Sequence, residues 1–370
     1  MHWQLIASDQ ALSEALVTAA EHPAVAVDTE FMRRNTFFPQ AALLQLSFGE
    51  VAFLIDPLAI QDTAGLVAVL TDPGIVKVLH SASEDLEVFN HWLGVLPHPL
   101  FDTQRGAALL DKGFSLGYAS LVEQMFGETL PKGETRSDWL KRPLSTSQCE
   151  YAAQDVAWLL PMWRDLQAQC DLQGKSDWVL SDGSDALDVF RASDGDALKR
   201  MKSAWKLDPR QLSRLMAICS WRESTARRRD KPRGWIIDDQ VCMQLALQDP
   251  STPQQLNSSV EMDHRSRRRY GDELLNLLEQ QRSKSDVDLP ARLPQPLDSR
   301  QRNQVKQLKT RLRSIASDVS AAPEALVQSK DYELLLREAA GTEIARPSHW
   351  DGWRRDVVID PLRAHIATLS

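Results

Sequence analysis

The sequence lacks three features that would define other classes of protein. No apolar run approaches the roughly 20 residues that cross a membrane as a helix, so no helical span is expected. The first residues show no basic stretch followed by an apolar segment, and we therefore expect no secretory signal and a cytoplasmic protein. The cysteines are far apart and form no Cys-x-x-Cys pair, which favours reduced, buried thiols in a cytosolic protein. The four cysteines are Cys149, Cys170, Cys219 and Cys242.

Length and charge indicate several domains. A chain of 370 residues with 43% hydrophobic and 25% charged residues has the composition of a globular protein, and about 100–200 residues per domain predicts two or three domains. The net charge of −8 hides an asymmetry, because residues 1–200 carry 14 Lys and Arg against 28 Asp and Glu, whereas residues 201–370 carry 29 against 23. The acidic half could hold cations and the basic half phosphates, although two solvated surfaces would give the same counts.

Strand-like and helix-like segments alternate through residues 1–170, which predicts an α/β layer architecture. The expected strands are 3–7, 24–31, 42–48, 51–55 and 75–79, with a hairpin turn at Gly49-Glu50. The expected helices are 9–20, 82–93, 103–110, 118–126 and 147–169. Ser8 is an expected N-cap, Ser81 and Glu84 an expected capping box, and Pro161 should kink or shorten the last helix.

The second half of the chain has a helical pattern. Strand signals disappear after about residue 207, and prolines at 232, 250 and 253 mark breaks between helical segments. Residues 171–196 predict a partly helical connector, and three prolines between 290 and 296 mark a second linker. The predicted organisation is a first domain over 1–170, a connector over 171–207, a helical domain over 208–284, a Pro-rich linker over 285–299 and a second helical domain over 300–370.

The first candidate motif is Asp28-Thr29-Glu30, at the end of an apolar run. Side chains two positions apart in a strand lie on one face, so Asp28 and Glu30 would project together. Two such carboxylates repel each other and resist desolvation, and a divalent cation would relieve both effects. Oxygen ligands favour Mg²⁺ or Mn²⁺ over zinc. A strand end that emerges into solvent would explain the two acids equally well.

Two further motifs place acidic side chains on helices. Asp85 falls in the first turn of a helix after a buried strand, where the helix dipole alone would favour an acid. Tyr151 and Asp155 are four positions apart and share a helix face, although a packed tyrosine beside a solvated acid would have the same spacing. His80 fits a loop histidine with ordinary partners, and we assign it no catalytic role.

Together these motifs form an ordered signature. An Asp-x-Glu strand, a helical Asp and a Tyr-x-x-x-Asp helix resemble the DEDD superfamily of 3′–5′ exonucleases, in its tyrosine-bearing branch. The stretches 83–89, 101–104, 136–140 (Arg-Ser-Asp-Trp-Leu) and 148–155 resemble the ribonuclease D family within it. Residues 208–281 resemble the helicase-and-ribonuclease-D C-terminal (HRDC) domain, most clearly at 221–223 and 234–239. The final segment is similar to a second, degenerate HRDC-like module.

The resemblance implies a fold, a reaction and a set of roles. The fold would be a ribonuclease H-like α/β domain with a mixed central sheet flanked by helices, followed by two all-α HRDC-type domains. The reaction would release nucleoside 5′-monophosphates from RNA 3′ ends, as in tRNA maturation, with two divalent ions, Mg²⁺ or Mn²⁺. Asp28 would bridge both ions, Glu30 and Asp155 would complete the water-activating site, and Asp85 would hold the second ion. Tyr151 would orient the water, because a phenol of pKa about 10 is a poor base at neutral pH. The expected state is a monomer.

Positive charge is concentrated at two places in the second half. One cluster comprises Arg227, Arg228, Arg229, Lys231 and Arg233, and the other comprises Arg267, Arg268 and Arg269. Both are candidates for phosphate contacts with RNA, and a solvated helix face is the alternative. We expect Trp205, Trp221 and Trp235 in helical cores. Phe31, Trp139 and Leu140 are candidate walls of a terminal-nucleotide pocket, although core packing would also explain each.

Two other functions fit parts of the pattern. A 3′–5′ DNA exonuclease could use the same carboxylates, because no motif indicates whether the protein recognises the 2′-hydroxyl of the terminal nucleotide. A non-catalytic RNA-binding or scaffold protein would predict damage to the metal-binding carboxylates, whereas all five signature positions are intact.

Overall fold

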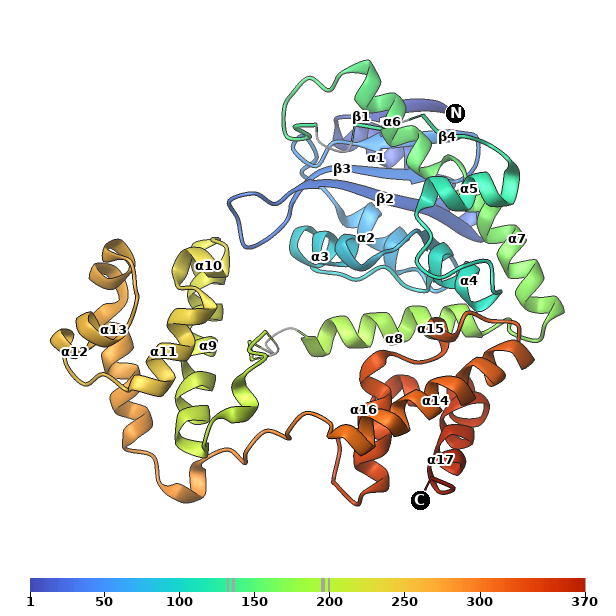
Figure 1. Ribbon diagram of the computed structural model, residues 1–370. Helices are drawn as coiled ribbons and strands as arrows, with labels where there is room; N and C mark the ends of the chain where they lie inside the picture. The colour runs from blue at the N-terminus through green and yellow to red at the C-terminus, as the bar shows by residue number, and fades with distance from the viewer. Residues whose placement is uncertain (132, 135–136, 194–196, 199, 370) are drawn as a thin grey trace. The chain divides into compact units, whose positions relative to one another are not determined.

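The computed structural model describes residues 1–131, 133–134, 137–193, 197–198 and 200–369. Over these ranges the chain divides into two compact units, and each is described by itself. Unit 1 comprises Met1–Met32, Pro39–Phe190 and Leu297–Ser370, and unit 2 comprises Arg33–Phe38 and Arg191–Pro296. Figure 1 follows the chain through both units. No helix in the ranges given above is long and apolar enough to cross a membrane.

A mixed sheet forms the centre of unit 1. Its described strands have the order β1-β4-β3-β2-β5-β6. They are β1 (His2–Ile6), β2 (Ala24–Met32), β3 (Gln40–Ser47), β4 (Val51–Ile55), β5 (Val76–Leu79) and β6 (Leu100–Asp102). β2, β3 and β4 pair antiparallel, whereas β1 pairs parallel with β4, and β5 pairs parallel with both β2 and β6. The predicted mixed sheet and the hairpin at Gly49-Glu50 are confirmed.

One face of the sheet is covered by helices that come early in the chain. Val25 and Val27 of β2, with Leu44 of β3, lie in a core that also holds apolar residues of these helices. The helices are α1 (Asp9–Leu16), α2 (Ala64–Thr71) and α3 (Ser83–Trp92), with a 3₁₀ turn at Ala19–Glu21. Ser8 caps α1 as predicted, because its side chain accepts from the N–H of Ala11.

The opposite face of the sheet is covered by α6 (Thr146–Ala157) and α7 (Leu159–Leu172). Ala24 and Ala26 of β2 lie in this second core, and Figure 1 shows α6 on one side of the sheet and α2 and α3 on the other. The single helix expected over 147–169 is two helices that meet at Trp158. Proline cannot donate a helical hydrogen bond, so Pro161 is tolerated only within the first turn of α7. Asp28 and Glu30 continue the alternation of Ala24 and Ala26 and therefore face α6.

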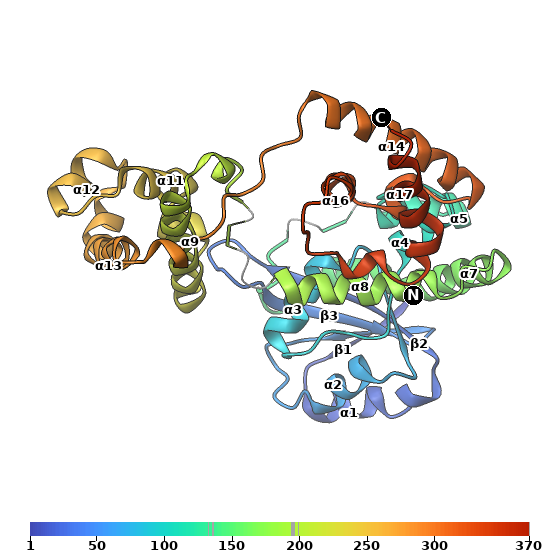
Figure 2. The ribbon, with the colours of Figure 1, turned by 90° about the horizontal axis from the view of Figure 1, so that it is seen from below.

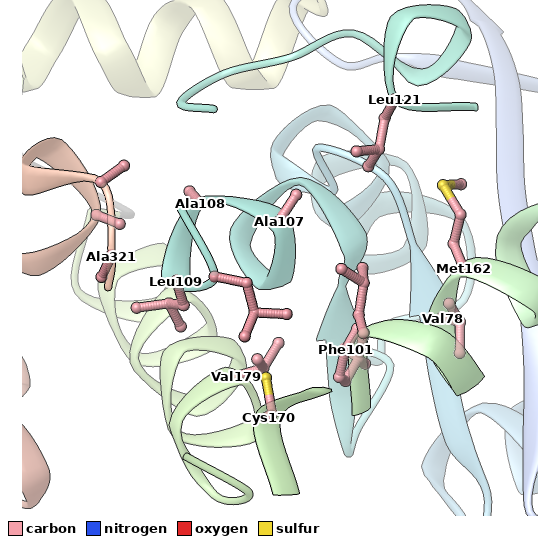
Figure 3. Close-up of a cluster of buried hydrophobic side chains, with 14 of the residues drawn as sticks. Val78, Phe101, Ala107, Ala108, Leu109, Leu121, Met162, Cys170, Val179 and Ala321 are labelled. Atoms are coloured by element: carbon pink, nitrogen blue, oxygen red, sulfur yellow. The ribbon is translucent and has the colours of Figure 1, made fainter. Parts of the chain in front are cut away.

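The C-terminal helices share the core of the sheet domain. The other helices of unit 1 are α4 (Thr103–Leu109), α5 (Tyr118–Phe126), α8 (Trp178–Ser193), α14 (Ser299–Asp318), α15 (Pro323–Leu326), α16 (Ser329–Ala339) and α17 (Asp360–Ile366), with a 3₁₀ turn at Ser348–Trp350 and a π-helical segment at Arg355–Ile359. The N–H of Ala322 donates to the carbonyl of Ala108 over 2.8 Å, and Figure 3 shows Ala321 beside Ala108 and Leu109. α8 lies between the sheet and the C-terminal helices α14, α16 and α17 in both views (Figure 1 and Figure 2). The segment 300–370 is thus helical, as predicted, and packs as part of unit 1.

Unit 2 is helical, with one insertion from the N-terminal part of the chain. Its elements are α9 (Pro209–Arg229), α10 (Arg233–Ile236), α11 (Asp239–Gln248), α12 (Pro253–Ser259) and α13 (His264–Arg282), with turns at Ala204–Lys206 and Asp286–Asp288. The segment Arg33–Phe38 connects β2 to β3 and belongs to this unit. Its Phe37 is 5% exposed and lies in the helical core. The backbone N–H groups of Phe37 and Phe38 donate to Asp230 over 2.8 and 3.0 Å.

Candidate active site

β2 supplies two carboxylates to the face beneath α6. Asp28 and Glu30 follow four buried apolar residues of β2, at positions 24–27, and are themselves half-buried. On the antiparallel partner β3, Gln45 lies directly opposite Asp28 and Leu43 directly opposite Glu30. Both acids therefore lie on a central strand of the sheet. The alternative explanation, a strand end that emerges into solvent, does not apply.

Asp85 reaches the same region from the first turn of α3. It is 7% exposed, and its Oδ1 accepts a hydrogen bond of 2.5 Å from the hydroxyl of Thr29. The expected capping box is wrong, since Ala82 is the N-cap of α3 and Ser81 has a φ of 61°. The N–H groups of Ser81 and Ala82 instead donate to the two carboxylate oxygens of Asp102, each over 3.0 Å. A side chain from the neighbouring helix start thus holds the turn that positions Asp85.

Tyr151 and Asp155 project from α6, one helical turn apart. A capping box of Ser145 and Gln148 fixes the start of this helix, and the Tyr151 hydroxyl hydrogen-bonds the Asp155 carboxylate. The ring of Tyr151 is crowded from the loop before the helix, because a Cβ at Gly133 would overlap it. The ring of Trp139 lies 6.1 Å away from it, centroid to centroid. The tyrosine is therefore held both by its hydroxyl and by its ring.

Burial raises the pKa of all four carboxylic acids, and the neighbouring acids raise those of Asp28 and Glu30 further. Burial raises the pKa of Asp28 well above its usual range, and the charges of Asp85, Asp155 and Glu30 raise it further. Burial, together with Asp155 and Asp85, raises the pKa of Glu30 to about 8. Burial raises the pKa of Asp85 and of Asp155 to about 7 in each case, against a lowering effect from their hydrogen-bond donors Thr29 and Tyr151. The predicted acids thus lie close together in one desolvated cluster, and among the described residues no positively charged side chain offsets these pKa shifts.

A divalent cation would supply that charge. The cluster offers only carboxylate oxygens, which suit Mg²⁺ or Mn²⁺. Across the residues that the structure describes, no group of three or more His, Cys, Asp or Glu is arranged as a ready-made metal site. Ion binding would therefore require the carboxylates to turn toward a common centre, and the donor chemistry fits the ion.

The other residues considered near the site have structural partners. His80 contacts the Thr103 hydroxyl through Nδ1 at 2.9 Å and the Leu116 carbonyl through Nε2 at 3.0 Å, in keeping with an ordinary loop histidine. Trp139 is 2% exposed and belongs to the core against α6, while Phe31 and Leu140 are half-buried. Arg136, the first residue of one quoted family stretch, lies outside the described residues. All four cysteines are buried free thiols, as predicted.

The two basic clusters both lie in unit 2. Some of their side chains bind protein groups, and the others face solvent. Arg227 and Arg233 both bind Glu223 and lie 5.0 and 4.4 Å from the Phe37 ring centroid. Lys231 donates to the carbonyl of Asn35, and Arg267 donates to the carbonyls of Val260 and Met262. Both sets of bonds lie within unit 2.

The remaining arginines of the clusters face solvent. Arg228, Arg268 and Arg269 are exposed, and Arg229 joins the clusters because its guanidinium lies 5.4 Å from the centroid of Tyr270. The expectation of core positions is wrong for Trp235, which is 59% exposed because its short helix buries Ile236 instead. Trp205 and Trp221 are half-buried.

Sequence reasoning assigned no role to Thr29, Asp102 or Gln45. Thr29 and Asp102 lie within motifs whose other residues carried the prediction. The hydrogen bond from Thr29 to Asp85 spans 56 positions and leaves no local signal in the sequence. Gln45 interrupts a run of leucines in β3, and this interruption is its only sign in the sequence.

These features define a class of protein. The family model described as 3′-5′ exonuclease matches residues 3–171. This range contains the mixed sheet and the acids that a central strand and two helices bring together. The model described as HRDC domain matches residues 211–278, within the helices of unit 2. The chain is thus a 3′–5′ exonuclease domain joined to an HRDC region.

Full-length relatives narrow the class to one family. The chain is 38% identical over 356 residues to a ribonuclease D of Pseudomonas paraeruginosa, covering 95% of this chain and 94% of that protein. It is 35% identical to a ribonuclease D of Escherichia coli, covering 98% of each. A crystal structure of the E. coli protein, 34% identical, aligns with a TM-score of 0.91 over 100% of this chain and 99% of that chain. The chain belongs to the ribonuclease D family of 3′–5′ exoribonucleases, and the predicted fold and activity are confirmed.

Proposed function

We propose that the carboxylate cluster hydrolyses RNA from its 3′ end with two divalent metal ions, Mg²⁺ or Mn²⁺, and releases nucleoside 5′-monophosphates. The observation that supports this is the clustering of four buried acids, Asp28, Glu30, Asp85 and Asp155. Burial raises the pKa of each, the neighbouring charges raise the pKa of Asp28 and Glu30 further, and a pair of cations would offset both effects. When bound, such ions neutralise charge on the phosphate and lower the pKa of an attacking water. Asp28 would bridge the two, Glu30 and Asp155 would complete one site, and Asp85 would complete the other.

Tyr151 would orient the attacking water rather than deprotonate it. Burial and the charges of Asp155, Glu30 and Asp28 raise the pKa of its hydroxyl above the ordinary value of 10.0. The phenol therefore keeps its proton at neutral pH and can donate or accept a hydrogen bond, but it cannot serve as a base. Asp155 accepts its hydrogen bond and would give it up, or share it, when water occupies the site.

The substrate we propose is the 3′ tail of a structured RNA such as a tRNA precursor. The E. coli relative is described as an exoribonuclease involved in structured RNA processing, and the basic surface of unit 2 offers contacts to phosphates outside the catalytic cluster. Arg228, Arg229, Arg268 and Arg269 would make most of these contacts, with Arg227, Lys231, Arg233 and Arg267 contributing less, because they are bound to protein groups. We propose that the protein acts as a monomer in the cytoplasm, where such RNAs are made.

The test is degradation of 5′-labelled RNA by the wild-type chain and by Asp28→Asn, with Mg²⁺ or Mn²⁺ added. The wild type should shorten the RNA from the 3′ end in single-nucleotide steps, with 5′-monophosphates found by chromatography, and a matched DNA strand should be degraded more slowly. Asp28→Asn should lose nearly all turnover and keep its circular dichroism spectrum. Glu50→Gln, an exposed acid in the turn between β3 and β4, is the matched control and should keep wild-type activity. Wild-type turnover by Asp28→Asn would contradict the proposal.

A further inference from the structure

Gln45 is a fully buried amide without a hydrogen-bond partner. Its side chain lies on β3 at 0% exposure, and neither Nε2 nor Oε1 has a partner within the described part of the chain. A buried polar group left unsatisfied costs about 1–3 kcal/mol, whereas an apolar side chain of the same shape would cost nothing. The strand itself supplies leucines at positions 43, 44 and 46. Packing alone therefore gives no reason for an amide at this position.

The position of Gln45 connects it to the carboxylate cluster. In the antiparallel register Gln45 is directly opposite Asp28, and directly opposed residues project from the same face with Cβ atoms about 4.5–5.5 Å apart. Leu43 and Leu54, its neighbours on that face, belong to the core beneath α6, in which Ala152 and Ala153 also lie. The amide is thus enclosed beside the one carboxylate that the proposed mechanism gives to both metal ions.

Asp28 has a need that this amide can meet. Within the described part of the chain, its carboxylate accepts a hydrogen bond from the backbone N–H of Thr29. A carboxylate that turns its oxygens toward two cations keeps outward lone pairs, and groups that hydrogen-bond a metal ligand fix its orientation. Gln Nε2 carries two N–H donors and no charge, so it can support a metal-bound carboxylate without competing with the metal.

We propose that Gln45 is a positioning residue that donates from Nε2 to the Asp28 carboxylate when the cluster binds its divalent ions. The proposal rests on the proposed two-metal function. It assigns Gln45 no contact with RNA and no part in proton transfer.

The test is metal binding by Gln45→Met, which keeps the length of the side chain and removes the amide. Isothermal titration with Mn²⁺ should give a Kd about 10–100-fold above that of the wild type, as for loss of other groups that orient metal ligands. The melting temperature in EDTA should be unchanged or higher, because an unpaired amide has been removed. Leu54→Met is the matched control, since Leu54 lies on β4 directly opposite Gln45 and on the same face of the sheet. It should bind Mn²⁺ as the wild type does.

The outcomes separate the two proposals. Wild-type Mn²⁺ affinity in a folded Gln45→Met variant, or a fall in its melting temperature without any change in Kd, would overturn the role of Gln45 and leave the two-metal function intact. If Gln45→Met does not fold, Gln45→Leu gives the same comparison with a shorter apolar side chain. Failure of the wild type to bind Mn²⁺, or equal binding by Asp28→Asn, would instead overturn the proposed function.

Discussion

The hydroxyl of Thr29 donates to Oδ1 of Asp85 over 2.5 Å and so joins the central strand β2 to the first turn of α3. Thr29 stands between Asp28 and Glu30, and strand alternation directs it to the opposite face of the sheet. One tripeptide therefore places two acids beneath α6 and holds a third acid, on a separate helix, through the residue between them. The Asp-Thr-Glu motif is a structural unit as well as a pair of candidate ligands.

We predict that Thr29→Val weakens metal dependence more than it weakens the fold. Valine keeps the shape and β-propensity of threonine but leaves Asp85 without its side-chain donor. The Mg²⁺ concentration for half-maximal turnover should rise about 10–100-fold, as measured from initial rates over a Mg²⁺ series. Thr71→Val is the control, because the Thr71 hydroxyl donates to the carbonyl of Val67 within α2. An equal shift in both variants would mean that the Thr29 bond has no special bearing on the site.

Stability without metal should fall as pH rises. A group whose pKa is higher in the folded state than in the unfolded state contributes stability that is complete below its ordinary value and is lost as pH passes its folded value. For Asp85 and Asp155 the change is from 3.8 to about 7, and for Glu30 it is from 4.5 to about 8. The melting temperature in EDTA should therefore decline between about pH 4 and pH 8, and millimolar Mg²⁺ should reduce the decline. Glu30→Gln should melt higher than the wild type at the alkaline end alone, and a constant difference across the range would contradict this explanation.

Tyr151→Phe and Tyr118→Phe should separate chemistry from structure. Loss of the Tyr151 hydroxyl should lower kcat on the order of 10²-fold with little change in KM, because the hydroxyl would act on the water and not on RNA binding. The Tyr118 hydroxyl donates to the Gln154 carbonyl and accepts from the Trp158 N–H. Its removal should lower the unfolding free energy by about 1–3 kcal/mol and change kcat far less. Steady-state kinetics and urea unfolding of both variants provide the measurement, and reversed results would overturn these roles.

Much of the fold could be predicted because its signals are local. The apolar alternation of β2, the N-cap at Ser8 and the helix over 118–126 each depend on residues close in sequence, and all appear where expected. The start of α3 could not be predicted, because the group that replaces the expected cap, Asp102, is 20 positions from Ala82. The same limit applies to Phe37, whose loop position gave no sign that it is buried in a helical core.

The site could be predicted as a set of residues but not as an environment. Motif order predicted Asp28, Glu30, Asp85, Tyr151 and Asp155 as site residues, and the structure brings their side chains near one another, while their roles stay a prediction. Burial and neighbouring charge, which raise their pKa values, depend on packing that no spacing encodes. The exposure of Trp235 was missed for the same reason, since an aromatic residue in a helical segment usually packs inward.

RNA binding should depend on the free arginines of unit 2. Arg268→Gln with Arg269→Gln should weaken binding and reduce the slope of log affinity against log salt by about 0.7 for each lost phosphate contact. Fluorescence anisotropy of a labelled RNA over a salt series measures both quantities. Arg300→Gln with Lys306→Gln removes the same charge from exposed positions on α14 and is the control. Equal slopes for the two double variants would show that net charge, and not this surface, determines binding.

Asp230 should anchor the connection between β2 and β3. Its carboxylate accepts from the N–H groups of Phe37 and Phe38, and its φ of 47° suits aspartate or asparagine better than alanine. We predict that Asp230→Ala releases the segment Arg33–Phe38, which contains two trypsin sites, Arg33 and Arg34. Limited trypsin digestion followed by mass spectrometry should show faster cleavage there than in the wild type. Asp230→Asn keeps both an acceptor oxygen and the backbone preference, so it should remain largely protected. Cleavage of Asp230→Ala at the wild-type rate would mean that the contacts of the Phe37 ring with Arg227 and Arg233 suffice to anchor the segment.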